Sequence, residues 1–196
     1  MDVFWTYLKT NALELSGVIT GMVCVWYNTR QNVWGWFWSI VSVTIYAVIF
    51  LEAKLYADMG LQVIFGLLSV YGLWQWLYGG KGRTVLPVSR VPSRWIPGLV
   101  GLCVAGTGSL SWVLHRFTDA SIPLVDSFTT AVSLIAQWML GRKYLENWIL
   151  WIGVDVIYVG MYIYKNLYWT AFLYVVYLGL SVYGYRDWGK SRGHRA

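Results

Sequence analysis

Apolar residues form seven long runs along this chain of 196 residues, and charged or turn-forming residues separate the runs. The runs are continuous rather than alternating, so they fit helices better than the strands of a membrane barrel. Each run is close to the roughly 20 residues that a helix needs to cross a bilayer. The predicted helices span residues 12–29, 33–52, 57–79, 95–115, 124–141, 145–164 and 167–186.

The sequence also contains an internal repeat at an offset of 112 residues. The sequence Leu-Ser-Val-Tyr-Gly at 68–72 returns at 180–184, and the same gap-free register holds across three segments. Such self-similarity indicates a duplication, which is common in membrane transporters. Further matches pair Glu14 with Asp126, Trp26 with Trp138, Arg30 with Arg142, Trp36 with Trp148, and Tyr46 with Tyr158.

The duplication predicts an all-α integral membrane protein that forms a single membrane domain over residues 1–196. Repeat one covers about 12–79, a connector helix covers about 95–115, and repeat two covers about 124–188. Three helices and one further crossing return the second triplet to the orientation of the first. We therefore expect seven transmembrane helices in a 3+1+3 arrangement of parallel repeats.

Composition supports a membrane location and adds nothing that needs a second domain. Hydrophobic residues make up 58% of the chain and charged residues 12%, far from the average soluble domain. The 14 Trp and 15 Tyr suggest rings at the lipid–water interface as well as in packing. The lipid bilayer is therefore the first expected partner.

The net charge of +6 reflects membrane topology rather than a nucleic-acid surface. Eleven of the 15 Lys and Arg residues fall on one side of the expected membrane, which by the positive-inside rule is the cytoplasmic side. This places the N-terminus outside and the C-terminus in the cytoplasm. The four on the other side are Lys9, Lys54, Arg116 and Lys165.

Asp155 stands near the centre of the sixth span, where a charged residue costs roughly 3 kcal/mol on insertion scales. Such residues usually face the inside of a bundle or a water-filled cavity. Asp155 is therefore a candidate partner for a polar or cationic substrate, and the alternative is a structural hydrogen bond to a neighbouring helix. For Glu14 and its register mate Asp126, equivalent capping or packing roles compete evenly with a functional role.

One face of the sixth span carries an amide, an indole, a carboxylate and a phenol. Asn147, Trp151, Asp155 and Tyr158 follow i, i+4, i+8, i+11 spacing, and Trp148 is adjacent. Aromatic planes close to a carboxylate suit a flat cationic ring, which they would hold by stacking and cation–π attraction. The alternative for the two Trp residues alone is interfacial anchoring.

The first repeat keeps part of this face, since Trp36 matches Trp148 and Val43 replaces the acid. The two halves would therefore bind one asymmetric ligand rather than two copies. Gln62 in the third span and Gln137 in the fifth add amides at membrane depth. Each amide is either a ligand contact or a helix–helix hydrogen bond.

Several signatures of other protein classes are missing from the sequence. There is no glycine-rich phosphate loop and no serine in a nucleophile-elbow pattern. His115 and His194 are the two histidines, one close to a loop and one in the tail. We expect no metal, no cofactor and no enzymatic activity, and a membrane-embedded enzyme remains the alternative from another class.

Two segments resemble the PnuC family of vitamin transporters, and the resemblance extends over nearly the whole chain. They are residues 54–72 and residues 142–151, which contain a Glu-Asn-Trp-x-x-Trp element. The resemblance implies a SWEET-like fold, a bacterial inner membrane location and a homotrimer. It also implies facilitated diffusion of a small-molecule vitamin, above all nicotinamide riboside, which a cytoplasmic kinase traps by phosphorylation.

The chain departs from nicotinamide riboside carriers at two places. Those carriers have Asn at the position of Asp155, and their ending differs from residues 184–188. Carriers of thiamine (the PnuT type) or of riboflavin look closer at both places. Nicotinamide riboside and thiamine both contain a cationic ring that suits Asp155, whereas riboflavin is neutral and fits less well. We expect nicotinamide riboside first and thiamine second.

Overall fold

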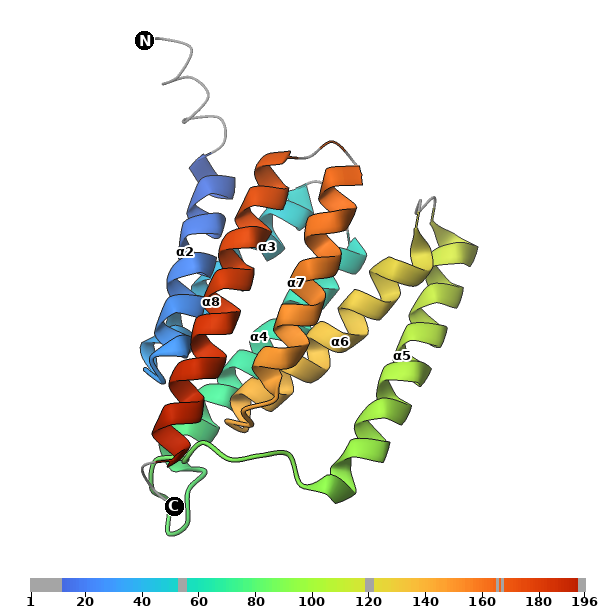
Figure 1. The fold of residues 1–196 in the computed structure, drawn as a ribbon. Coiled ribbons are helices and arrows are strands. Elements are labelled where there is room, and N and C mark those ends of the chain that lie inside the picture. Colours follow the sequence, from blue (N-terminus) through green and yellow to red (C-terminus); the bar gives the residue numbers. More distant parts are fainter. Residues whose placement is uncertain (1–11, 53–55, 119–121, 165, 167, 194–196) are drawn as a thin grey trace. The chain divides into compact units, whose positions relative to one another are not determined.

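The computed structural model describes residues 12–52, 56–118, 122–164, 166 and 168–193. Its long elements are helices, as the apolar runs predict (Figure 1). They are α2 (Ala12–Thr29), α3 (Trp34–Glu52), α4 (Tyr56–Tyr78), α5 (Ile96–Phe117), α6 (Pro123–Gly141), α7 (Asn147–Tyr164) and α8 (Tyr168–Gly193), with the short 3₁₀ helix η1 (Ser93–Trp95) before α5.

All seven expected helices are present in the described ranges, and most boundaries agree within two residues. The exception is α8, which we expected to end at 186 and which continues to Gly193. The sequence prediction stopped where the apolar run meets Arg186 and Asp187. A helix that has left the apolar layer tolerates charges, and Lys190 and Arg192 in the last turn complement its dipole.

Four helical segments of the described chain are long and apolar enough to cross a membrane: Trp34–Glu52, Asp58–Tyr78, Ser93–Phe117 and Asn147–Tyr164. Helix α6 is not among these four segments, and it carries four buried polar side chains. They are Ser127, Thr129, Ser133 and Gln137.

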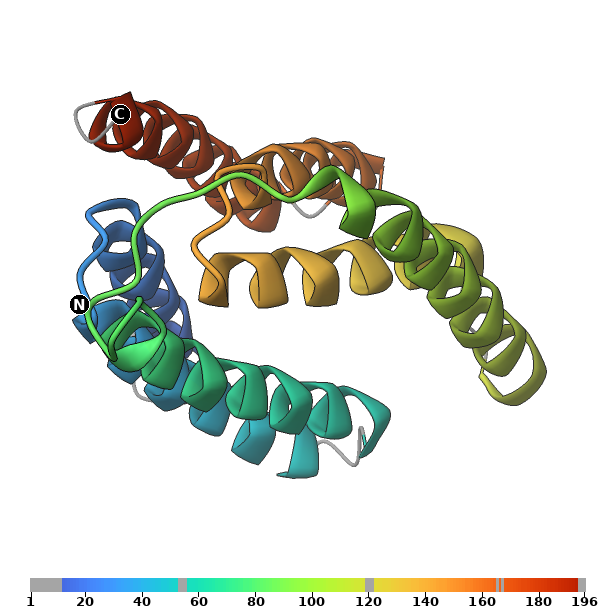
Figure 2. The same cartoon turned by 90° about the horizontal axis from the view of Figure 1, so that it is seen from below.

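The chain forms two compact units, residues 1–86 and 87–196. In the first unit, α2 packs on α3 and α3 packs on α4. In the second unit, α6 packs on α7 and α7 packs on α8, which run side by side (Figure 2). Helix α5 packs on α6 alone among the long helices, and none of its residues is buried.

The same turn ends α2 and α6, 112 residues apart. Gln31 and Lys143 adopt the left-handed conformation, with φ of 54° and 50°. The amide of the next residue bonds back five positions in each case, Asn32 to Tyr27 and Tyr144 to Met139, both at 3.0 Å. This pattern is the Schellman motif, which satisfies the last carbonyls of a helix and reverses the chain. Glycine usually takes the left-handed position, but here Gln and Lys do.

A tryptophan laid on a glycine joins the next pair of helices in each unit. Trp36 contacts Trp76 edge to face, and Trp148 contacts Trp188 in the same way, both with ring centroids 5.4 Å apart at 88°. Trp36 lies directly against Gly72 of α4, and Trp148 lies against Gly184 of α8. A ring can come this close because glycine has no Cβ, so a small residue sets the spacing of the helices.

The turn between α6 and α7 and the C-terminal end of α8 lie at the same end of the second unit (Figure 1). Arg142 and Lys143 lie in that turn, and Trp188 in the last turns of α8 contacts Trp148 at the start of α7. Arg116, near the end of α5, is at the opposite end of that helix from Arg94. Lys9, Lys54, Lys165 and Arg195, which the sequence count includes, lie outside the described residues.

We expect Gly184→Ala to destabilise the protein. The new Cβ would lie 2.6 Å from Cε2 of Trp148, a distance that forces the ring or the helix to move. Overpacking of this kind costs about 1–3 kcal/mol, so the melting temperature in detergent should fall. Gly179→Ala in the same helix is the matched control, because its Cβ would meet nothing within 4 Å. Equal melting temperatures for both variants would contradict the role of this contact.

Candidate functional site

The polar face that the sequence predicts runs along α7 in the second unit. Asn147 opens the helix with none of its surface exposed, and Asp155, two turns later, is 4% exposed. Trp151 and Tyr158 are half-buried. Because the four residues recur every turn, they share one side of a helix whose other residues are largely Ile, Val and Gly.

Asn147 and Trp148 carry buried polar atoms that could meet a ligand. The Asn147 amide donates from Nδ2 to the carbonyl oxygen of Tyr144 at 2.6 Å. Its Oδ1 and the indole nitrogen of Trp148 have no hydrogen-bond partner among the residues that the structure describes. Buried polar atoms are normally paired, so one acceptor and one donor are available at the start of α7.

The two tryptophans of this face are in different environments. Trp148 is 2% exposed, lies against Gly184 and makes an edge-to-face contact with Trp188. Its register mate Trp36 has the matching contacts with Gly72 and Trp76. Both rings already pack on a neighbouring helix, so they contribute to the fold. Trp151 is the half-buried ring and the better platform for a flat ligand.

Asp155 accepts a hydrogen bond from Ser181 of α8, with 3.1 Å between Oγ and Oδ2. Ser181 belongs to the repeated Leu-Ser-Val-Tyr-Gly sequence, and its register mate Ser69 pairs with Ser39 at 2.8 Å. The residue of the second unit that corresponds to Ser39 is Trp151, which offers no hydroxyl. The serine of α8 thus pairs with a residue one turn further along α7, which is the acid.

This contact supports the structural alternative for Asp155 without excluding the functional one. An ionised carboxylate has about four lone-pair directions, and the Ser181 hydroxyl uses one of them. The remaining capacity suits an amino group or a cation. The carboxylate therefore has a neighbour that fixes its orientation and keeps the capacity to accept further hydrogen bonds.

Tyrosine rings from α7 and α8 form a cluster one turn beyond Asp155. Tyr158 lies 4.7 Å from Tyr174 and 5.9 Å from Tyr162, and Tyr162 stacks on Tyr174 at 5.2 Å. In the first unit, Tyr46 stacks on Phe50 in the same way. Tyr158 is therefore one wall of an aromatic cluster rather than an isolated phenol.

The other candidates lie on separate elements. Gln137 is buried on α6 in the second unit, at 7% exposure. Trp36 and Gln62 belong to the first unit, on α3 and α4, and Gln62 is half-buried. The structure thus assembles Asn147, Trp148, Trp151, Asp155 and Tyr158 on one helix.

Sequence reasoning missed Ser181, Tyr162 and Tyr174. Ser181 stands inside the most obvious repeated sequence of the chain, so the register could have identified it as a partner for α7. Tyr174 has Gln62 as its register mate. The repeat therefore gives no reason to expect an aromatic residue there.

Asp126 and its register mate Glu14 are the other acids that the sequence analysis considered. Asp126 lies in the first turn of α6, where a negative charge is favourable at the positive end of the helix dipole. The side chain of its mate Glu14 is outside the described part of the chain. Within the described ranges, no group of three His, Cys, Asp or Glu side chains lies close enough to hold a metal ion.

The comparisons with known proteins agree on one family of membrane transporters. The model of a family described as nicotinamide mononucleotide transporter matches residues 11–190. The chain is 25% identical to the nicotinamide riboside transporter PnuC of Escherichia coli, over 94% of this chain and 89% of that one. It is 23% identical to the riboflavin/roseoflavin transporter RibM of Streptomyces davaonensis, over 89% of this chain and 83% of the relative.

A solved structure shares the fold. The crystal structure of the vitamin B3 transporter PnuC superposes with a TM-score of 0.75 and 26% sequence identity. The match covers 100% of this chain and 88% of that chain. The relatives and the solved structure are all transporters.

Proposed function

Since this chain belongs to the nicotinamide mononucleotide transporter family, we propose that it carries nicotinamide riboside across the membrane by facilitated diffusion. It is a multi-pass membrane protein and a vitamin transporter of the PnuC family, not an enzyme. One observation carries the proposed site: α7, a membrane-spanning helix, presents buried Asn147 and Asp155 on the same face as Trp151. A carboxylate in the middle of such a helix, as Asp155 is, usually marks a substrate pathway.

We assign the roles of the site residues from their surroundings. Trp151 offers the stacking surface, and Asp155 supplies the negative charge for a cationic ring. Asn147 and the Trp148 indole N–H supply an acceptor and a donor. Tyr158 closes the face with its phenol, and the remaining candidate contacts are Trp36, Gln62 and Gln137.

The proposal includes an arrangement in the bacterial inner membrane. The shared turns and the shared Trp–Gly contacts, 112 residues apart, support two parallel repeats joined by α5 in a 3+1+3 arrangement. The basic end of the second unit supports a cytoplasmic C-terminus and an external N-terminus. Family resemblance adds a homotrimer and a cytoplasmic kinase that phosphorylates the vitamin and so prevents its return.

Thiamine is the second candidate substrate, because of Asp155. An ionised carboxylate only accepts hydrogen bonds, and thiamine offers it both a cationic ring and an amino group. Nicotinamide riboside gains the charge attraction, but its carboxamide would be served as well by Asn. Riboflavin comes third, since it is neutral, although RibM shows that a family relative carries it.

Purified protein in liposomes should equilibrate labelled nicotinamide riboside without accumulating it above the external concentration. Among the described residues there is no chain of buried acids and histidines for proton relay, so no driving force is expected. Uptake into protein-free liposomes is the control. Accumulation driven by an imposed proton or sodium gradient, with no kinase present, would show that the transport is active.

We expect Trp151→Ala to weaken vitamin binding by roughly 1–3 kcal/mol, the scale of stacking between a base and an aromatic side chain. The protein should remain folded, because the Trp151 ring is only half-buried. Calorimetry in detergent measures the affinity. Trp112→Ala on α5 is the matched control, since that ring is 64% exposed. Unchanged affinity in Trp151→Ala would indicate that Trp151 anchors the helix at the membrane interface and does not contact the vitamin.

Asp155→Asn should separate the two candidate substrates. If thiamine is carried, the variant loses the charge attraction and binding falls by at least tenfold, about 1.4 kcal/mol. If nicotinamide riboside is carried, binding falls less than it does for thiamine, because an amide can still serve its carboxamide and the charge attraction alone is lost. The melting temperature in detergent is the folding control, because the Ser181 hydroxyl can still donate to the amide oxygen of the variant. If a thiamine-binding parent and a stable Asp155→Asn protein bind thiamine equally well, Asp155 makes no substrate contact.

A further inference from the structure

The segment between α4 and α5, residues 79–95, is called the connector from here on. It is hydrogen-bonded to the turn between α6 and α7. Pro87 and Pro92 favour an extended backbone for the residues before them. Between them, Ser89 donates its N–H to the carbonyl of Lys143 at 3.0 Å and accepts from the N–H of Leu145 at 2.9 Å. The connector therefore pairs with the turn as a short parallel bridge.

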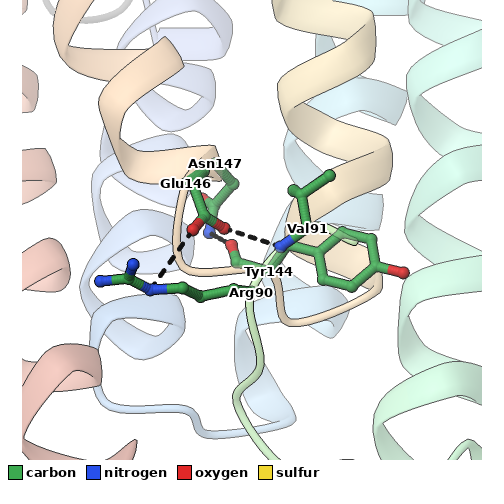
Figure 3. Close-up of polar contacts among 5 residues, drawn as sticks. All are labelled: Arg90, Val91, Tyr144, Glu146 and Asn147. Carbon is green, nitrogen blue, oxygen red and sulfur yellow. Dashed lines mark hydrogen bonds and ion pairs between the residues drawn. The ribbon is translucent and has the colours of Figure 1, made fainter. Parts of the chain in front are cut away.

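Glu146 adds a side-chain attachment at the same place (Figure 3). Its Oε2 accepts the backbone N–H of Val91 at 3.0 Å, and its Oε1 lies 3.7 Å from Nε of Arg90. The Arg90 side chain is 62% exposed, so solvent weakens the ion pair. The bond from the Val91 amide is the stronger of the two, because its acceptor is a charged, partly buried carboxylate.

Val91 is itself anchored in the second unit. Its side chain packs against the buried cluster of Ile135, Met139 and Tyr144. The backbone N–H of Val91 then points at Glu146, as Figure 3 shows. Without the carboxylate, this partly buried donor would have to find another acceptor, which is costly away from water.

Glu146 also caps the N-terminus of α7, whose first residue is Asn147. Its backbone carbonyl accepts from the amides of Ile149 and Leu150, at 3.1 and 3.3 Å, so it occupies the N-cap position. The next two residues are Asn147 and Trp148, which carry the unpaired polar atoms of the candidate site. One side chain thus ties the connector to the first turn of the site helix.

The first unit supplies an internal comparison. The register mate of Glu146 is Trp34, which opens α3 and is 56% exposed. Its backbone N–H is capped locally by Asn32, at 3.0 Å. Glu146 therefore stands at the start of α7, which the connector contacts through Ser89 and Val91. This is expected if Glu146 holds the connector and α7 together.

We propose that Glu146 is a positioning residue that fixes the first turn of α7 to the connector and so holds Asn147 in its substrate-binding orientation. This inference rests on the proposed function, because it assigns Asn147 to the substrate site. Glu146 contacts no ligand in this proposal. It acts through the position of its neighbours.

Three variants separate the contacts of Glu146. Glu146→Ala removes both contacts with the connector. Glu146→Gln keeps an acceptor for the Val91 N–H and loses the charge, and Arg90→Ala removes the ion pair alone. We expect the Kd for nicotinamide riboside, and for thiamine in parallel, to rise roughly tenfold in Glu146→Ala. It should stay within about threefold of the parent in Glu146→Gln and within about twofold in Arg90→Ala.

Hydrogen exchange without ligand supplies the second readout. Amides of residues 143–152 should exchange faster in Glu146→Ala than in the parent, and Glu146→Gln should restore their protection. A residue with a merely structural role would lower the melting temperature and leave the Kd of the folded protein unchanged at low temperature. If Glu146→Ala does not fold, Glu146→Asp replaces it, since its shorter side chain does not reach the connector as well.

Two outcomes would overturn the proposal: unchanged exchange in residues 143–152, or faster exchange with an unchanged Kd. Glu146→Gln behaving like Glu146→Ala would also contradict it, because the amide keeps the acceptor. A parent protein that binds neither vitamin overturns the proposed function instead. The exchange experiment needs no ligand and still decides whether Glu146 anchors α7.

Discussion

The close contact between a tryptophan and a glycine is the interaction on which the pairs α3–α4 and α7–α8 depend. Lipid tails are as apolar as leucine, so helices in a bilayer gain little from burying apolar side chains against one another. Close approach and shape provide the attraction instead. Gly184 allows the Trp148 ring to rest on the backbone of α8, and Gly72 does the same for Trp36. The position of every polar group on α7 relative to α8 follows from this spacing, including the bond between Asp155 and Ser181.

The helices could be predicted from sequence because their apolar runs end at charges or turn residues that the bilayer excludes. The end of α8 could not, since Arg186 and Asp187 end the apolar run and the helix continues to Gly193. The polar face of α7 follows from helical spacing alone. The packing of Trp148 could not be predicted, because an indole that anchors, stacks or packs has the same sequence pattern. It takes the neighbouring Gly184 to identify a packing contact.

The attachment of the connector lies beyond sequence reasoning for another reason. A connector between Gly79 and Pro97 that is basic and contains proline predicts a loop, and nothing in its pattern identifies the turn that it contacts. The bonds of Ser89 and Val91 are between backbone groups or from backbone to carboxylate, and any residue except proline could supply them. Glu146 was visible as part of a family motif, but its partner lies 55 residues away in sequence. Only the folded chain brings the two together.

Ser39 in the first repeat corresponds to Trp151 in the second. This difference makes the two halves of the chain chemically unequal. Two identical halves would present the same chemistry twice, and a ligand could not distinguish one from the other. A single aromatic residue removes a hydroxyl, and the serine of α8 then pairs with an acid one turn away. These two differences change the chemistry of α7, while the turns and ring contacts described above occur in both halves. A scaffold of this kind can acquire new selectivity in one half without rebuilding the other.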